Sequence, residues 1–224
     1  MKRTPLAERR LPDYTRGEEI CNMVTHIVGG AMGIAACALC PIVGAMHHDP
    51  YAVVSGALFG FSMLVLYVIS SVYHGLSPRL KGKKVMQVLD HCSIFLLIAG
   101  SYTPMALVKL RAVSPALGWT LFGIIWALAA VGAAFNAIDL KKYAKFSMIT
   151  YLLMGWAIIA RIGLVYRLLG PRGFALLLLG GLAYTVGAVL YGLGKKRRYM
   201  HSLFHVFTVV GSLLHLLCML LYVL

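Results

Sequence analysis

The chain has 224 residues, of which 60% are hydrophobic and only 12% are charged, and its formal net charge is +14. A soluble domain carries about a quarter of charged residues, so this composition excludes a soluble globular protein and indicates one integral membrane domain. The basic residues form short clusters between apolar runs, as topology signals do, which argues against nucleic acid as a partner.

Seven apolar runs are long enough to cross a bilayer as helices, since a spanning helix needs about 20 residues. In chain order they cover residues 20–46, 51–75, 85–108, 117–136, 147–168, 173–193 and 200–223. We therefore predict an all-α membrane protein built as a seven-transmembrane helix bundle. It would consist of a basic N-terminal segment, residues 1–17, and a membrane domain, residues 18–224. The first apolar run is too long for a signal-peptide core, so we expect the N-terminal segment to be retained.

The basic residues also predict an orientation. Most of them lie in the N-terminal segment and in the second, fourth and sixth connections: Lys2, Arg3, Arg9, Arg10, Arg16, Arg79, Lys81, Lys83, Lys84, Lys141, Lys142, Lys145, Lys195, Lys196, Arg197 and Arg198. Connections rich in Lys and Arg stay in the cytoplasm. The N-terminus is therefore expected to be cytoplasmic and the C-terminus outside, the reverse of a G-protein-coupled receptor.

Small residues and one proline predict how the helices pack. Gly29 with Gly33, and Gly56 with Gly60, form G-x-x-x-G patterns that permit close approach of two helix backbones. With seven helices in one chain, contact within the bundle is the expected use of both patterns. Pro104 should kink or break the third helix. The five cysteines show no disulfide framework, and packing is their expected role.

Four polar side chains share one expected membrane depth. His201 and His205 are four residues apart and therefore lie on one helix face, about 5–10 Å inside the basic edge of the sixth connection. His74 lies about 7 Å and Asp90 about 9 Å inside the edge of the second connection. Polar groups inside a bilayer are costly and commonly functional, so this shared depth points to a site between helices.

Imidazole nitrogens are good zinc ligands, and three of them with an open fourth position is the arrangement of catalytic zinc, whose bound water ionises near pH 7. Asp90 is then either a fourth ligand or a group that holds the zinc water or acts as general base. Ser70 precedes His74 by four residues on the same face and is placed to orient it or to contact a bound carbonyl. The alternative is that histidines at helix ends are only hydrogen-bonded, without a metal.

Four motifs carry a resemblance to a known family. They are E-E-I-C-N-M-V-T-H at 18–26, S-S-V-Y-H at 70–74, D-H-C-S-I-F-L-L-I-A-G-S-Y-T-P at 90–104 and H-S-L-F-H at 201–205. In this order they resemble hemolysin III, the bacterial branch of the progestin and adipoQ receptor family, which includes the adiponectin receptors. The resemblance covers residues 18–224. It implies seven helices, a cytoplasmic N-terminus and the multi-pass topology of a bacterial plasma (inner) membrane protein.

The resemblance also assigns the site residue by residue. It implies Zn²⁺ as cofactor, with ligands on His74, His201 and His205, and it places Asp90 behind the ligands and Ser70 at the site. Zinc agrees with an imidazole-rich site.

The other polar residues near this edge are open to two interpretations. Glu19, Asn22 and His26 lie at the cytoplasmic end of the first helix and belong to the family pattern. Hydrogen bonds between helices and contact with a substrate are equally good readings of them. His91 points about 100° away from Asp90 and is not expected to be a ligand. His215 lies about 25 Å beyond the basic edge, where a buried hydrogen bond is its expected role.

Three functions remain for such a chain. The first is a zinc-dependent, ceramidase-like hydrolase of a lipid amide or ester, with Asp90 and Ser70 as catalytic residues and membrane lipids as partners. The second is a non-enzymatic protein of membrane homeostasis or sensing, whose structural zinc ties the helices together. The third is the cytolysin that the family name implies, which the absence of a secretion signal and of a polar lumen argues against. The sequence leaves the substrate and the oligomeric state open.

Overall fold

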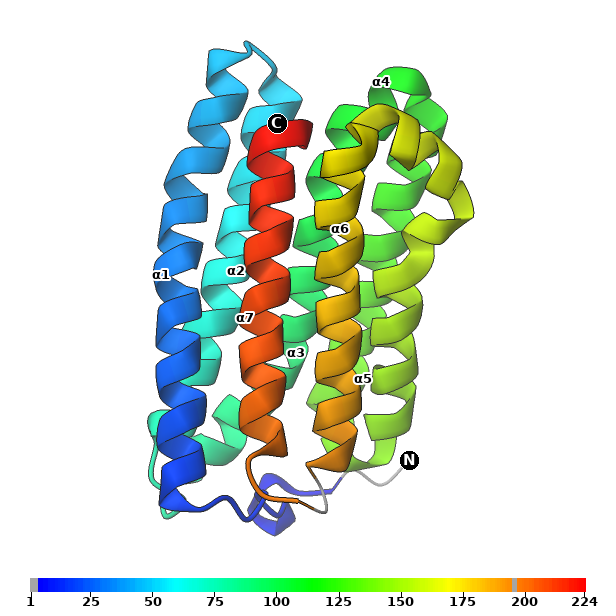
Figure 1. The fold of residues 1–224 in the computed structure, drawn as a ribbon. Helices are drawn as coiled ribbons and strands as arrows, with labels where there is room; N and C mark the ends of the chain where they lie inside the picture. The colour runs from blue at the N-terminus through cyan, green and yellow to red at the C-terminus, as the bar shows by residue number, and fades with distance from the viewer. Residues whose placement is uncertain (1–3, 195–196) are drawn as a thin grey trace.

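The computed structural model describes residues 4–194 and 197–224, and within these residues it is helical and contains no strand (Figure 1). The long helices are α1 (Arg16–Met46), α2 (Pro50–Gly75), α3 (Lys81–Pro104), α5 (Pro115–Trp156), α6 (Ile162–Leu193) and α7 (Met200–Cys218). The short elements are the 3₁₀-helices η1 (Leu6–Glu8) and η3 (Ala157–Arg161), the π-helices η2 (Met105–Leu110) and η4 (Met219–Val223), and α4 (Arg111–Val113). Four of the basic residues used for orientation, Lys2, Arg3, Lys195 and Lys196, lie outside the described residues.

Five helical stretches of the described chain are long and apolar enough to cross a membrane, so the protein is a multi-pass membrane protein. They are Arg16–Met46, Pro50–Gly75, Lys81–Val113, Pro115–Leu193 and Met200–Val223. The fourth is 79 residues long and contains three of the apolar runs expected to span separately.

Two breaks interrupt this long stretch. Asp139 has extended backbone angles (φ −161°, ψ 102°), and its Oδ1 accepts hydrogen bonds from the backbone N–H groups of Lys141 and Lys142. It therefore caps the second half of α5, as a helix N-cap does. Gly170 has φ +65°, which glycine adopts without strain, and Pro171 follows it at the start of the next helical segment. The chain changes direction at the first break (Figure 1).

The helices are packed through small and polar residues while large aliphatic side chains face outward. In α1 the buried positions include Asn22, His26, Gly33 and Ala36, whereas exposed positions include large aliphatics such as Ile34. This distribution is typical of a helix that packs against other helices on one side and meets lipid on the other. The expected close approach is confirmed between α1 and α2, the most extensively packed helix pair.

The crossing of α1 and α2 leaves no room for a side chain at Gly60. A Cβ there would lie 2.5 Å from the backbone nitrogen of Cys37 and 2.7 Å from its Cα. We expect Gly60→Ala to lower the free energy of unfolding by about 1–3 kcal/mol, because the two backbones must separate. Thermal unfolding in detergent measures this. The matched control is Gly123→Ala, where nothing lies within 4 Å of the new Cβ, and an equal loss there would contradict the packing argument.

The third helix ends as an α-helix at Pro104, but the chain stays helical beyond it. The chain continues from α3 through η2 into α4, and the hydrogen-bond pattern widens to that of a π-helix directly after the proline. The expected break is therefore replaced by a local π-helical segment, one of the adjustments by which a helix accommodates proline in a membrane. All five cysteines are free, as expected.

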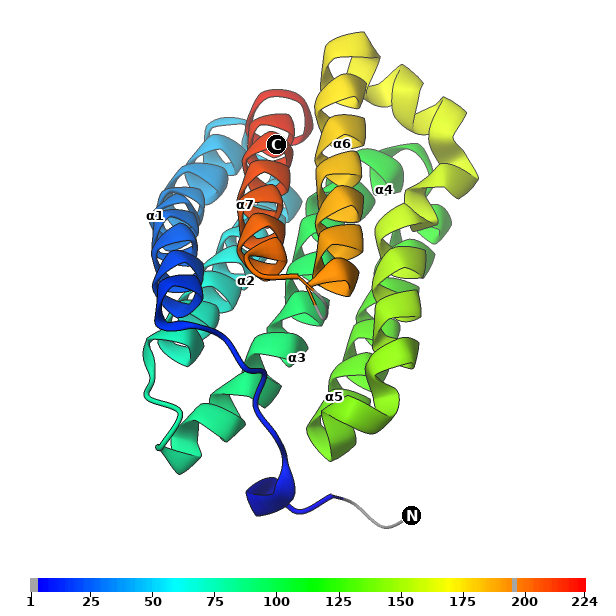
Figure 2. The same ribbon diagram turned by 60° about the horizontal axis from the view of Figure 1, so that its bottom comes forward.

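The described N-terminal residues, 4–15, run beneath the bundle as a strap from the start of α1 to the break in α5 (Figure 2). Asp139 Oδ2 accepts hydrogen bonds from the backbone N–H and the hydroxyl of Thr4. Arg9 donates from Nη2 to the carbonyl oxygen of Ile138, 2.6 Å away, and its side chain is buried. Both residues thus tie the strap to the break in α5. The strap begins at the end of the bundle opposite to Leu224 (Figure 1).

Candidate metal centre

Polar contacts between α1 and α7 fix the register of the two helices at the strap end of the bundle. α1 begins with a capping box between Thr15 and Glu18, and Glu18 Oε1 also accepts a hydrogen bond from the backbone N–H of Tyr199, 2.8 Å away. One turn further, Ser202 donates its hydroxyl proton to Asn22 Oδ1 at 2.6 Å. These contacts hold the first turns of α7 beside α1, and α7 carries two of the expected ligands.

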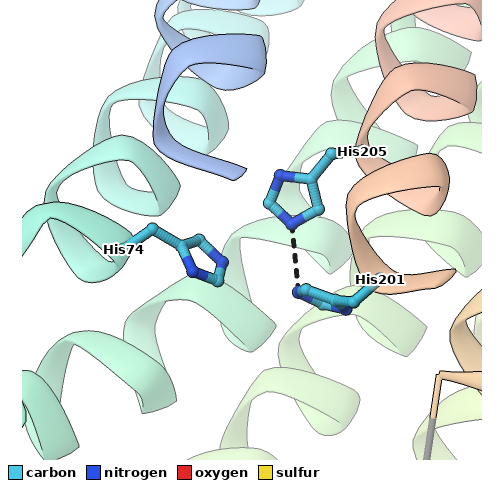
Figure 3. Close-up of side chains that lie close together, drawn as sticks. All are labelled: His74, His201 and His205. Atoms are coloured by element: carbon cyan, nitrogen blue, oxygen red, sulfur yellow. Dashed lines mark hydrogen bonds between the residues drawn. The ribbon is translucent and has the colours of Figure 1, made fainter. Parts of the chain in front are cut away.

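The structure brings His74, His201 and His205 together (Figure 3). One nitrogen of each ring lies within 4.8 Å of the others, and all three side chains are buried. The Nε2 atoms of His201 and His205 are 3.1 Å apart. Two nitrogens bound to one tetrahedral zinc are about 3.3 Å apart, so this pair already has the spacing of a shared ion. The triad is therefore a group of side chains that can hold a metal ion.

His74 also suits a metal ion, because one of its nitrogens donates a hydrogen bond and the other keeps a lone pair. Nδ1 lies 2.6 Å from Oε2 of Glu19, which as a carboxylate only accepts, so Nδ1 carries the proton. Nε2 then holds the lone pair, and it is buried with no hydrogen-bond partner among the described residues. A buried acceptor without a donor is costly, and a metal ion would satisfy it. The side chains present fit a metal bound by three imidazoles.

Two aromatic rings pack on histidines of the triad. The Tyr14 ring of the strap stacks on His201, with ring centroids 4.9 Å apart and an angle of 16°. Burial raises the pKa of the Tyr14 hydroxyl, so it stays protonated at neutral pH. His26 stacks on His205 with centroids 3.7 Å apart, and neither of its nitrogens has a partner among the described residues.

A cavity of about 1020 Å³ adjoins the centre and extends into the bundle between α3, α5, α6 and α7. Its lining includes His205 of the triad together with His26, Ser70 and Asp90. The Ser70 hydroxyl is buried and has no partner among the described residues. Asp90 does not join the cluster of possible metal ligands, which consists of the three histidines. The predicted catalytic residues thus face the same space as one of the histidines.

The structure also places the other polar residues of the sequence analysis. Asn22 makes the interhelical hydrogen bond described above, and Glu19 contacts His74. His91 is not part of the triad, but its ring also lines the cavity and lies 3.4 Å from the Tyr191 hydroxyl. His215 makes a part-buried contact in which Nε2 lies 3.2 Å from the carbonyl oxygen of Leu177, so the expected hydrogen bond is present but only partly enclosed.

Two residues of this region were missed by sequence reasoning. Lys83 counted only as a loop charge, yet it is 1% exposed, and Nζ lies 2.6 Å from Oε1 of Glu19. Tyr14 lies in the polar N-terminal segment, where no periodic pattern marks a ring that packs against a helix. The only readable signal was the capping box at Thr15 and Glu18, which places the start of α1 directly after Tyr14.

Comparison with known proteins decides the family. The sequence model of the family described as "Haemolysin-III related" matches residues 14–216. The chain belongs to this family. It is 41% identical over 207 residues to "Hemolysin-3" of Bacillus cereus, covering 92% of each chain. It is 37% identical over 209 residues to "Hemolysin-3 homolog" of Bacillus subtilis (strain 168), covering 93% of this chain and 96% of that protein.

A more distant relative is eukaryotic. The chain is 25% identical over 208 residues to "Monocyte to macrophage differentiation factor" of Homo sapiens, covering 88% of this chain and 81% of that protein. The family match, residues 14–216, contains all three histidines of the triad, together with Ser70 and Asp90. The resemblance to hemolysin III stated from the four motifs is thereby confirmed.

Proposed function

We propose that this protein is a zinc-dependent hydrolase of a lipid amide or ester in the bacterial inner membrane. It would cross the membrane seven times, with the strap end of the bundle in the cytoplasm and Leu224 outside. The breaks at Asp139 and Gly170 support seven crossings, because they divide the 79-residue stretch into three segments. The clusters of basic residues support the orientation.

One observation carries the proposal: three buried imidazoles converge beside a large cavity that Asp90 and Ser70 also line. Three protein ligands leave a fourth position open, whereas structural zinc is normally closed by four. Zinc bound in such a site polarises a carbonyl oxygen and lowers the pKa of a water molecule. The triad would hold the ion, and the cavity would admit the substrate to it.

The residues around the triad have separate tasks in this proposal. Asp90 would accept the proton of the attacking water. The neighbouring Nδ1 of His91 does not occupy its carboxylate, because that nitrogen is 3.8 Å away and already donates to the carbonyl oxygen of Gln87. Ser70 would donate its hydroxyl proton to the substrate carbonyl oxygen, which would give that hydroxyl the partner it lacks. His26, buried beside His205, is a second possible contact for a polar group of the substrate.

The cavity suits a substrate with a long apolar chain. From the triad it continues between the helices to His215, and apolar side chains such as Leu97, Ile98 and Met148 line it. A site about 5–10 Å inside the basic edge lies near the headgroup region of the membrane, where the amide or ester bond of a lipid is found. Membrane lipids are therefore the proposed partners and substrate class.

The experiment is to incubate the purified, zinc-loaded protein with lipid amides and lipid esters and to measure released fatty acid by mass spectrometry. We expect turnover by the wild type and background levels in His205→Ala, which removes one ligand. His47→Ala is the control, because Nδ1 of His47 contacts the Leu224 carbonyl oxygen at the other end of the bundle. Equal turnover by His205→Ala and the wild type would refute the proposed zinc-dependent hydrolase activity.

A structural metal is the second candidate. Its supporting observation is that the triad joins α2 to α7 in a region already held by hydrogen bonds that Asn22 and Glu19 of α1 accept from Ser202 and His74. In that case a chelator would lower the unfolding temperature of the wild type sharply, and no lipid would be turned over. The protein would then act in membrane homeostasis or as a sensor.

A cytolysin is the third candidate, and it rests on the name "Hemolysin-3" carried by the relative from Bacillus cereus. The apolar lining of the cavity and the outward-facing aliphatic residues favour a resident membrane protein over a secreted pore. Lysis of red cells by the purified protein at low concentration would support the cytolysin instead.

A further inference from the structure

The carboxylate of Glu19 contacts a candidate metal ligand on one side and a buried lysine on the other. Its Oε2 lies 2.6 Å from Nδ1 of His74, and its Oε1 lies 2.6 Å from Nζ of Lys83. Lys83 is 1% exposed, and Nζ also donates to the carbonyl oxygen of Leu76 at 2.8 Å. A series of contacts therefore runs from Lys83 on α3 through Glu19 on α1 to His74 on α2.

These contacts determine which nitrogen of His74 keeps a lone pair for a metal ion. A neutral imidazole carries its proton on one nitrogen, and the hydrogen bond made by that nitrogen fixes which one it is. Because the carboxylate of Glu19 accepts a hydrogen bond from Nδ1–H, the proton stays on Nδ1 and the lone pair lies on Nε2, the buried atom without a partner among the described residues. Asn22 Nδ2 is 3.4 Å from the same Nδ1, too far to compete with the 2.6 Å contact.

Lys83 holds the carboxylate in this position. A buried lysine is costly unless it is paired and hydrogen-bonded, and here one ammonium group is satisfied by Glu19 and by the carbonyl of Leu76. The carboxylate is fixed between a cation and an imidazole N–H, and its side chain is 15% exposed. Neither Glu19 nor Lys83 is itself part of the cluster of possible ligands.

We propose that Glu19 and Lys83 are positioning residues that hold His74 as the Nδ1-protonated tautomer and thereby set the affinity of the triad for its metal. This rests on the proposed metal centre. Partners of this kind behind a ligating histidine orient the ring and raise its basicity. In this proposal Glu19 makes a hydrogen bond between helices, to His74, and does not contact the substrate. This chooses between the two roles that its sequence position leaves open.

The test measures the zinc dissociation constant of purified, metal-depleted protein by competition with a chromophoric chelator. We expect Glu19→Gln to raise that constant about 10- to 100-fold. This variant leaves the Lys83 ammonium buried without its ion pair, which is itself destabilising. The double variant Glu19→Gln/Lys83→Met removes that charge, and we expect it to fold and to retain the loss of affinity. Wild-type affinity in the folded double variant would overturn the proposal.

Two further measurements separate positioning from structure. Asp49→Asn changes a carboxylate at the opposite end of α2, where Oδ1 accepts a hydrogen bond from the backbone N–H of Tyr51, and it does not touch His74, so its zinc affinity should stay within about threefold of the wild type. ¹⁵N NMR of the metal-free protein, with the His74 signals assigned by their loss in His74→Gln, should show a protonated Nδ1 in the wild type and a changed proton distribution in the double variant. An unchanged tautomer would contradict the proposal.

A failure of this inference differs from a failure of the metal centre. If the wild type itself binds no zinc, the metal centre, the hydrolase and the positioning role of Glu19 are all refuted. If the wild type binds zinc and the Glu19 variants bind it equally, only the positioning role falls.

Discussion

Purified wild-type protein is expected to contain about one zinc ion per chain, as a centre with three imidazole ligands requires. His201→Ala should reduce this to less than about 0.1, because two remaining ligands bind zinc too weakly to survive purification. The Nε2 atoms of His201 and His205 are 3.1 Å apart, so removal of either one dismantles the closest pair of the triad. Elemental analysis of protein prepared without added metal and without an affinity tag that binds metal measures the effect.

His215→Ala is the control for this experiment. His215 is also carried by α7, but its Nε2 contacts the carbonyl oxygen of Leu177, away from the triad. Its loss should leave the zinc content at about one per chain, since no ligand is removed. A wild type without metal, or a His201→Ala variant that keeps it, would refute the centre.

The largest expected effect on turnover without loss of metal is that of Asp90→Asn. The carboxamide cannot accept the proton that we assign to Asp90, so the rate of lipid hydrolysis should fall about 10²- to 10⁴-fold. The zinc content should not change, because Asp90 lies on the cavity wall outside the cluster of three histidines. Measuring both quantities on the same preparation separates a catalytic role from a ligand role.

Asp49→Asn is the matched control for Asp90→Asn. Asp49 caps α2 by accepting a hydrogen bond from the backbone N–H of Tyr51, and asparagine caps a helix as well as aspartate does. Both turnover and zinc content should stay at wild-type levels. If Asp90→Asn lost zinc together with activity, Asp90 would be a ligand, and if it kept full activity it would have no part in the reaction.

The cluster of three histidines could be predicted from two regular features of a helix, its period and its rise per residue. The spacing of His201 and His205 follows from the helix period, and the depth of His74 follows from the rise per residue counted from a basic edge. The G-x-x-x-G contacts were predictable for a similar reason, since only glycine permits the backbone approach found at Gly60. Family motifs then supplied the identity of the expected metal.

The partners of these residues could not be predicted, because they depend on how each helix is rotated against its neighbours. A buried lysine and a solvated one look alike in a sequence, so Lys83 was read as a topology signal. The stacking of His26 on His205 requires α1 and α7 to be adjacent, although they lie at opposite ends of the chain. The extended backbone at Asp139 had no signal beyond its place between two apolar runs.

The strap has a consequence for how shortened versions of this chain must be interpreted. Thr4 and Arg9 are bonded to the break in α5, several strap residues form part of the cavity wall, and Tyr14 covers His201. A truncation before α1 would therefore open the cavity wall and uncover His201, a candidate metal ligand, in one step. Access to the cavity and the environment of the triad would change together, and only single substitutions within the strap can tell the two effects apart.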